Sequence, residues 1–290
     1  WWDQEDMYGP LAMYKTLEHT DKDNQVYLVM GPWNHGGWGG SGRRLGAIDF
    51  GSDTGTYFRK EIQAPWFAKL LKDKGTFTPA EATVFQSGSN KWMSYDAWTP
   101  KGGKKRELYL QADGKLGFEK PAQSGEAFDS YVSDPKTPVP YRPTPILQTY
   151  TQGSSWRFWL VDDQRHLEGR KDVLSWQTDV LAEDLTITGD VIGNLFASTT
   201  GTDSDWVVKL IDVYPTDAQP ANMAGYQLMV SEEIFRGRYR KSYEKAEAIK
   251  PNTPLEYSID MRGQNYSFKK GHRIMIQVQS SWFPLVDRNP

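Results

Sequence analysis

The sequence predicts an α/β segment followed by an all-β sandwich, and three observations support this fold class. A continuous apolar run at residues 26–30 lies between two helix-like patterns, and such runs are typical of strands buried on both faces. After about residue 78, apolar residues recur with a period of two, which is typical of half-buried strands. Gly- and Pro-rich spacers separate these later runs. We therefore predict one domain portion at residues 1–78 and a second domain at residues 79–290.

The α/β segment is predicted to begin with a helix and a buried strand. Pro10 fits an early helical position, and apolar residues follow at helical spacing from Leu11 to Leu17. The polar residues 21–24 end this helix. The strand at residues 26–30 then follows, so the segment has the helix–strand alternation of an α/β sheet.

A second helix is predicted after a loop rich in Gly, Trp and His at residues 31–42. Pro65 is expected to kink this helix or to lie near its start, because proline lacks the backbone N–H that a helix interior requires. Gly75 is expected to end the helix as a C-cap. The apolar face of the helix consists of Phe58, Ile62, Trp66 and Leu70.

The remainder of the chain is predicted to form short strands joined by turns. Residues 108–118 are typical of a hairpin, with Ala-Asp-Gly at residues 112–114 as its turn. Helix signals are scarce after this point, which favours a β-sandwich of the jelly-roll type. The further expected strands lie at residues 185–189, 206–214, 226–230, 255–261 and 274–279.

Composition excludes several functional classes. The 290 residues carry 34 basic and 37 acidic side chains and no basic block, so the sequence indicates no nucleic-acid partner. No apolar run approaches the ~20 residues that a membrane helix needs, so no membrane partner is expected. The absence of cysteine excludes disulfides and a cysteine nucleophile.

No metal and no cofactor is predicted. His19, His166 and His272 show no metal-ligand spacing along the chain. Asp203 and Asp205, with Asp212, suggest a calcium site at first sight, but Gly-Thr-Asp before a strand is more typical of a turn.

An Asp and a His carry the strongest chemical signal. Asp3 lies in the motif Trp-Asp-Gln-Glu-Asp at residues 2–6, just before the first helix. His35 lies in Gly-Pro-Trp-Asn-His-Gly-Gly at residues 31–37, just after the buried strand, where functional groups of open α/β sheets cluster. A hydrogen-bonded carboxylate would orient the imidazole and stabilise its protonated form. Taken separately, Asp3 is also typical of a helix cap, and His35 of a loop histidine held by the backbone.

The chain order of these two residues suits an α/β-hydrolase, in which Ser precedes the acid and the acid precedes His. Asp3 precedes His35, but no Gly-x-Ser-x-Gly motif occurs in the sequence. We therefore expect both ends of the chain to be cut and the nucleophile to lie upstream. On that expectation the 290-residue stretch is inactive by itself.

The motifs at residues 2–6 and 31–35 resemble the acid and histidine motifs of the CocE/NonD serine hydrolases. This group contains α-amino-acid ester hydrolases, which the chain resembles most, glutaryl-cephalosporin acylase relatives, cocaine-esterase-like enzymes and Xaa-Pro dipeptidyl-peptidases. The resemblance extends over essentially the whole chain, through segments at residues 131–135, 170–176, 197–206 and 209–215.

The resemblance implies the C-terminal part of an α/β-hydrolase domain followed by a jelly-roll, galactose-binding-like domain. It implies that Asp3 is the acid of a Ser-His-Asp triad and that His35 is its base. It also implies that Glu5 and Asp6 belong to a carboxylate cluster that binds the α-ammonium group of the substrate. The alternative is that both acids only interact with the dipole of the following helix.

The function expected from the resemblance is cleavage and transfer of α-amino acyl groups of esters or amides, including β-lactam-type amides. Clustered carboxylates would repel a glutaryl group, which weakens the acylase alternative. A dipeptidyl-peptidase, a general carboxylesterase and a non-catalytic jelly-roll binding module remain alternatives. The expected partners are a small-molecule substrate, the upstream part of the same enzyme and further copies in a homo-oligomer. The expected location is secreted or periplasmic.

Overall fold

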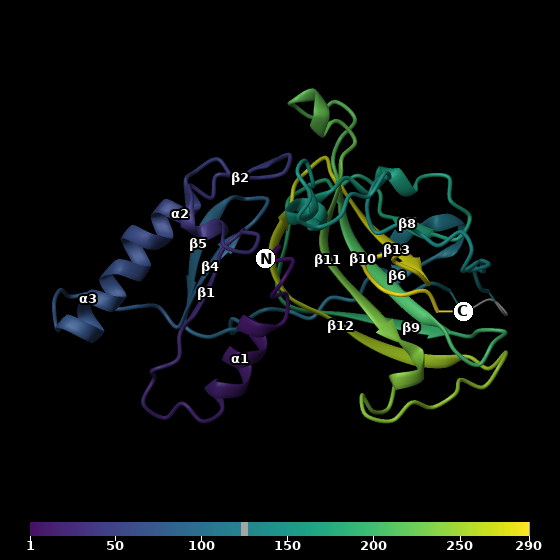
Figure 1. Ribbon diagram of the computed structural model, residues 1–290, viewed down its shortest axis with the longest axis horizontal. Helices are drawn as coiled ribbons and strands as arrows, with labels where there is room; N and C mark the ends of the chain where they lie inside the picture. Colours follow the sequence, from purple (N-terminus) through teal and green to yellow (C-terminus); the bar gives the residue numbers. More distant parts are fainter. Residues whose placement is uncertain (123–126, 290) are drawn as a thin grey trace.

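The protein is described by a computed structural model that covers residues 1–122 and 127–289, so the predicted domain end at Pro290 lies outside the described residues. A smaller α/β part lies beside a larger β-sandwich, and the N-terminus lies between the two parts (Figure 1). The model is mostly β, as the sequence predicts for the region after residue 78. The two parts share one hydrophobic core cluster that contains residues of both.

The first helix and strand of the α/β part form where the sequence predicts them. Helix α1 (Gly9–Glu18) has Pro10 in its first turn, where the missing N–H costs no hydrogen bond. Leu11 and Tyr14 are its buried residues. Strand β1 (Leu28–Met30) is shorter than the predicted run, because residues 26 and 27 approach the sheet as extended chain without pairing in it.

The second predicted helix consists of three pieces, α2 (Thr54–Tyr57), a π-helical stretch η2 (Phe58–Gln63) and α3 (Ala64–Lys72). Pro65 lies in the first turn of α3, so the irregular stretch precedes it and accommodates its missing N–H. Gly75 is not the C-cap. Asp73 ends the helix in the left-handed conformation, and its N–H donates to the carbonyl of Lys69 over 3.1 Å. Asp tolerates this conformation, so the helix ends before Gly75 is reached.

The apolar face of this helix is only partly covered. Ile62 is buried, but Leu70 is about half exposed within the described residues. Phe67 and Leu71 are exposed beside it. The period in the sequence therefore gave the helix correctly, whereas the apolar side chains near its C-terminal end stay exposed.

The sheet of the α/β part has the order β1-β4-β5. Strand β4 (Ala82–Gln86) pairs parallel with β1, and β5 (Lys91–Tyr95) pairs antiparallel with β4. The sheet therefore contains strands from both sides of the predicted boundary at residues 78/79, and this boundary stays a prediction. Strand β1 is the edge of the sheet in the part of the chain that the structure describes.

Two further small hairpins flank the sheets. The turn predicted at residues 112–114 joins β6 and β7, and Asp113 and Gly114 both have positive φ there. The second hairpin lies directly after the loop at residues 31–42. The bounds are Arg44–Leu45 for β2, Ile48–Asp49 for β3, Tyr109–Leu110 for β6 and Leu116–Gly117 for β7.

The β-sandwich packs a four-stranded antiparallel sheet, in the order β11-β10-β13-β8, against the antiparallel pair β12-β9. The predicted strands are confirmed, but β9, β11 and β12 are at least twice as long as the sequence indicates. Glycines interrupt the alternation in β9, and a bulge between Asp260 and Gly263 interrupts it in β12. The bounds are Leu174–Gln177 for β8, Leu185–Ala197 for β9, Asp205–Val213 for β10, Gln227–Arg236 for β11, Leu255–Phe268 for β12 and Arg273–Gln279 for β13.

Strand β10 is buried on both faces, which explains its nearly continuous apolar sequence. One face packs on β9 and β12, and the 3-10 helices at residues 156–167 contribute to the cover of the other. Lys209 lies in the middle of β10 with no exposed surface. Its Nζ donates to Oε1 of the buried Gln164 over 2.9 Å and lies 5.4 Å from the ring centroid of Trp282.

Lys209 predicts a pH dependence of stability. Burial lowers the pKa of Lys209 to about 7, although Glu232 on the neighbouring strand opposes this shift. Between pH 7 and the ordinary pKa of 10.5, the unfolded chain therefore binds up to one proton more than the folded protein. Under linkage, the unfolding free energy must then rise as pH rises through this window. We expect this contribution in urea unfolding curves of the full-length protein between pH 7 and pH 9.

The matched variant is Lys209→Met, which keeps the length of the side chain and removes the titrating group. The slope of its unfolding free energy against pH should be smaller than the wild-type slope. The difference between the two slopes should correspond to nearly one bound proton. Parallel pH profiles for the two proteins would show that Lys209 is charged throughout in the folded state. Tyrosines whose pKa burial raises, such as Tyr226, act only above this window and with the opposite sign.

Candidate active site

Trp2 fixes the segment that carries Asp3. Its indole is 2% exposed, stacks on Phe50 at 5.9 Å and donates from Nε1 to the carbonyl of Met229 in β11 over 3.0 Å. Its backbone N–H donates to the carbonyl of Trp33 over 3.2 Å. The Asp3 segment is thus attached both to the sandwich and to the loop that carries His35.

The structure brings Asp3 and His35 together. Nδ1 of His35 lies 3.1 Å from each carboxylate oxygen of Asp3, and Oδ1 of Asp3 also accepts from the backbone N–H groups of Glu5 and Asp6 over 2.9 and 3.0 Å. An ionised carboxylate only accepts hydrogen bonds, so Nδ1 is the donor and Nε2 carries the free lone pair. The arrangement leaves Nε2 available to take a proton, and 46% of the His35 side chain is exposed.

A tight turn holds His35 in place. The N–H of Gly37 donates to the carbonyl of Asn34 over 2.9 Å, and Gly36 has a φ of 72°, which disfavours any residue with a Cβ. The N–H of His35 donates to Oε1 of Gln4 over 3.2 Å. The ring of Trp38 lies edge-on at 6.1 Å from the imidazole. Neither Gln4 nor Trp38 was predicted as a support of the pair.

Trp33 packs the base of the same loop. Its Nε1 donates to Oγ1 of Thr54 over 2.8 Å, and its ring lies 5.2 Å from that of Phe58. Gly42, with a φ of 65°, lies where a Cβ would approach Thr54 and Trp33 within 2.7 Å. The loop is therefore packed against the start of α2 so closely that only glycine fits at this position.

The two predicted carboxylates lie on different sides of the pair. Oε2 of Glu5 lies 3.9 Å from Nε2 of His35, so its charge is next to the nitrogen that would exchange protons. Oδ1 of Asp6 lies over Gly9, where a Cβ would come within 2.3 Å of it, at the start of α1. The helix-dipole alternative therefore keeps support for Asp6 and loses support for Glu5.

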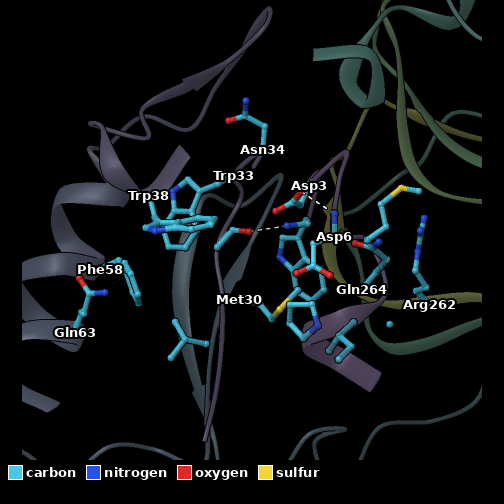
Figure 2. Close-up of a pocket in the computed structure, with 17 residues that line it drawn as sticks. Asp3, Asp6, Met30, Trp33, Asn34, Trp38, Phe58, Gln63, Arg262 and Gln264 are labelled. Atoms are coloured by element: carbon cyan, nitrogen blue, oxygen red, sulfur yellow. Dashed lines mark hydrogen bonds between the residues drawn. The ribbon is translucent and has the colours of Figure 1, made fainter. Parts of the chain in front are cut away.

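Two cavities adjoin the pair. The first has a volume of about 220 Å³ and is mostly apolar. Figure 2 shows Asp3 and Asp6 between an aromatic side, with Trp33, Trp38 and Phe58, and a polar side with Arg262 and Gln264 from β12. The second has a volume of about 350 Å³. It is lined by Gln4, Glu5, Asn34 and His35 on one side and by Thr149, Tyr150, Thr151, Ser154, Trp156 and Arg157 on the other.

Arg262 reaches the first cavity from the bulge in β12, where it has a φ of 70°. It forms an ion pair with Glu232, whose side chain is 4% exposed, and its guanidinium lies 5.1 Å from the ring centroid of Tyr8. Burial raises the pKa of Glu232, while the Arg262 charge opposes this shift. The sequence analysis missed this pair because the alternation in β12 breaks at the bulge.

Within residues 1–122 and 127–289, no group of three or more His, Asp and Glu side chains is arranged to hold a metal ion. Asp203 pairs with Arg238, and Asp205 accepts from Asn289. His272 ends a turn, since its N–H donates to the carbonyl of Lys269 over 3.0 Å, and its Nδ1 donates to Oδ1 of the buried Asp212 over 2.8 Å. None of the described helices has the length and apolar character that crossing a membrane requires.

Comparison with known proteins gives similar results for sequence and structure. Residues 75–290 match the family described as the X-Pro dipeptidyl-peptidase C-terminal non-catalytic domain, so Asp3 and His35 lie before the matched part. The chain is 32% identical over 284 residues to cocaine esterase from Rhodococcus sp. (strain MB1 Bresler), which covers 92% of this chain and 46% of that protein.

Two solved structures match the entire chain. One is an aminopeptidase from a marine sediment archaeon, Thaumarchaeota archaeon, with a TM-score of 0.97 and 47% identity over 100% of this chain and 48% of that one. The other is an α-amino acid ester hydrolase labelled with selenomethionine, with a TM-score of 0.93 and 44% identity over the same shares. The chain spans a little under half the length of the proteins it matches.

Proposed function

The chain belongs to the family of the X-Pro dipeptidyl-peptidase C-terminal non-catalytic domain, and from this premise we propose that it is the rear portion of a serine hydrolase that cleaves and transfers α-amino acyl groups. The relatives include a cocaine esterase and an α-amino acid ester hydrolase, as the motif resemblance predicted. The observation that carries the proposal is the Asp3–His35 pair, with Nε2 of His35 free.

The pair suits acyl transfer through a serine of an upstream part of the same protein. His35 takes the proton of the serine hydroxyl as its oxygen attacks the ester or amide carbonyl, and it then gives this proton to the leaving group. Water or an amine attacks the acyl-enzyme in the second half of the reaction, again with His35 as base. Asp3 holds the imidazole by Nδ1 and stabilises the imidazolium that forms in each half.

Glu5 supports the preference for α-amino acyl groups. Its carboxylate lies 3.9 Å from Nε2 of His35, so a cation bound there would lie one or two bonds from the reacting carbonyl, as an α-ammonium group does. A neutral acyl group would gain nothing from this charge, and an acidic one would be repelled. Asp6 lines the first cavity, on the other side of the pair, so its part in the proposed carboxylate cluster rests on the motif resemblance alone.

The finer description of the fold belongs to the same proposal. The four-stranded sheet packed on β9 and β12 suits a jelly-roll, galactose-binding-like domain at residues 79–290, preceded by the rear part of an α/β-hydrolase domain at residues 1–78. Homo-oligomeric assembly and a secreted or periplasmic location are proposed on the motif resemblance alone.

Peptide amides form the second candidate substrate class. The likeness to an aminopeptidase structure at 47% identity favours this class over a general carboxylesterase. Both candidates place a free α-ammonium group at Glu5, so the same carboxylate test applies to each. A purely non-catalytic module leaves the Asp3–His35 pair unexplained, although the description of residues 75–290 as non-catalytic suits that part of the chain.

The test compares two esters on the full-length protein, phenylglycine methyl ester and phenylacetic acid methyl ester, which differ only by the α-amino group. We expect a higher kcat/KM for the amino ester and labelling of a serine by a fluorophosphonate probe. Glu5→Gln should lower kcat/KM for the amino ester by about tenfold or more and leave the other ester unchanged, because a hydrogen bond to a charged group contributes about 1.5–3 kcal/mol.

Glu183→Gln is the matched control, because Glu183 is exposed and lines neither cavity. Equal kcat/KM for the two esters would reject the α-amino preference while leaving an esterase. Failure of the wild-type protein to hydrolyse either ester or to react with the probe would reject the hydrolase itself.

A further inference from the structure

The 350 Å³ cavity is built from two segments that are far apart in the sequence. Glu5 and His35 line it from the α/β part, and the loop at residues 149–157 lines it from the second domain. Its volume lies in the range of small-molecule sites. Because the proposed base lies in its wall, this cavity is a space that a substrate would occupy around the scissile bond.

The loop supplies one cation to this cavity, Arg157. The side chain is exposed, and within the described residues it makes no ion pair and no side-chain hydrogen bond. Its guanidinium lies 5.9 Å from the ring centroid of Phe158. Other arginines of the same domain are paired, such as Arg142 with Asp162 and Arg170 with Asp172. Arg157 is thus an exposed cation in the lining of the cavity, with no acceptor for its guanidinium among the described residues.

Opposite charges therefore lie in one cavity with the proposed base. Glu5 is beside Nε2 of His35, and Arg157 belongs to the facing wall. A dipeptide-sized molecule carries an α-ammonium group at one end and a carboxylate at the other, and two extended residues span about 7 Å. Its scissile carbonyl lies between the two charges, and the cavity holds His35 together with both charged side chains.

We infer that Arg157 selects substrates whose leaving group carries a carboxylate, so that the preferred substrates are zwitterions with an α-ammonium group on the acyl side. The inference rests on the proposed function, since it assigns the leaving-group side of the same site. A planar guanidinium is suited to a carboxylate because two parallel N–H donors meet its two oxygens.

The aromatic residues of the same loop suit this class of leaving group. Tyr150 is 88% exposed, and its ring lies 6.1 Å from that of Trp156 in an edge-to-face arrangement. Both line the cavity with Arg157. They would cover the side chain of the leaving group, while Arg157 binds its carboxylate.

The test uses two esters of phenylglycine on the full-length protein, one with lactic acid and one with lactamide as the leaving group. The two leaving groups differ only in that lactic acid carries a carboxylate where lactamide carries a neutral amide. Both substrates are cleaved at an ester bond, so the lower reactivity of a peptide bond does not affect the comparison. We expect Arg157→Gln to lower kcat/KM for the lactic acid ester by about tenfold relative to the lactamide ester. Arg157→Glu should reverse the preference of the wild type.

Arg106→Gln is the matched control, because Arg106 is also exposed, also lies over a phenylalanine ring and lines neither cavity. The preference for the carboxylate should also weaken as salt is added, since exposed charges are screened. Equal effects of Arg157→Gln on both esters, or turnover of phenylglycine methyl ester with neither lactic ester accepted, would overturn the inference. Inactivity of the wild type on all three esters would instead overturn the proposed function.

Discussion

Replacement of His35 by alanine in the full-length protein is expected to lower kcat for an α-amino acyl ester by about a thousandfold or more. Nδ1 of His35 is held by both carboxylate oxygens of Asp3, and the change removes the Nε2 that the proposed mechanism uses as the base. Labelling of the serine by a fluorophosphonate should slow by a similar factor. The measurement is kcat and the labelling rate at one pH for each variant.

Asp3→Asn tests the same pair from the acid side. The amide keeps the size of the carboxylate, but its NH₂ group can face Nδ1 and favour the wrong tautomer, which costs about 10⁴ in kcat in a well-studied triad. Asp3 also accepts two backbone N–H groups, so the variant requires a check of folding by circular dichroism. His19→Ala is the control, because His19 is an exposed histidine at the end of α1. Full activity of His35→Ala would disprove the catalytic role of the pair.

Arg262→Met is expected to lower the unfolding free energy of the full-length protein by about 3–5 kcal/mol. The change leaves Glu232 buried without its cation, and the loss of a buried partner is costly because the remaining charge stays desolvated. The contact with the ring of Tyr8 is lost as well. Urea unfolding curves at neutral pH measure the difference.

The double variant Arg262→Met with Glu232→Gln distinguishes two causes of the loss of stability. One is the unpaired buried charge of Glu232, and the other is the lost packing of the Arg262 side chain. Removal of both charges should restore most of the unfolding free energy, since an uncharged pair has no desolvated ion. A double variant as unstable as the single one would show that packing around Arg262, and not the charge of Glu232, sets the cost.

The elements with regular periods could be predicted from the sequence, and the irregular ones could not. The apolar spacing after Pro10 gave α1, and the alternation at residues 274–279 gave β13. The period failed at the bulge beside Arg262, where an extra residue shifts the alternation from one face to the other. The end of α3 was missed because Asp73 takes the left-handed conformation that the sequence analysis assigned to glycine alone.

The candidate site was predictable to the extent that local sequence determines it. Asp3 and His35 each lie directly beside a secondary-structure element, so their loops could be placed at one edge of a sheet. Glu5 and Asp6 could not be told apart, because the side that each faces depends on the turn held by Asp3. The position of Arg157 in the same cavity as His35 could not be predicted, because the two residues are more than a hundred positions apart in the sequence. No local sequence pattern indicates such a contact.

Trp2 has a consequence for the modular exchange of domains. Its ring lies in the core of the sandwich, while the next residue is the proposed acid of the hydrolase part. A chimera that replaces residues 79–290 with those of a distant homologue would therefore change the residues that pack around Trp2. We expect this change to displace Asp3, although the junction of the chimera lies far from Asp3 in the sequence. The sandwich therefore helps to position the segment that carries the proposed acid, through the burial of Trp2 and its hydrogen bond to Met229.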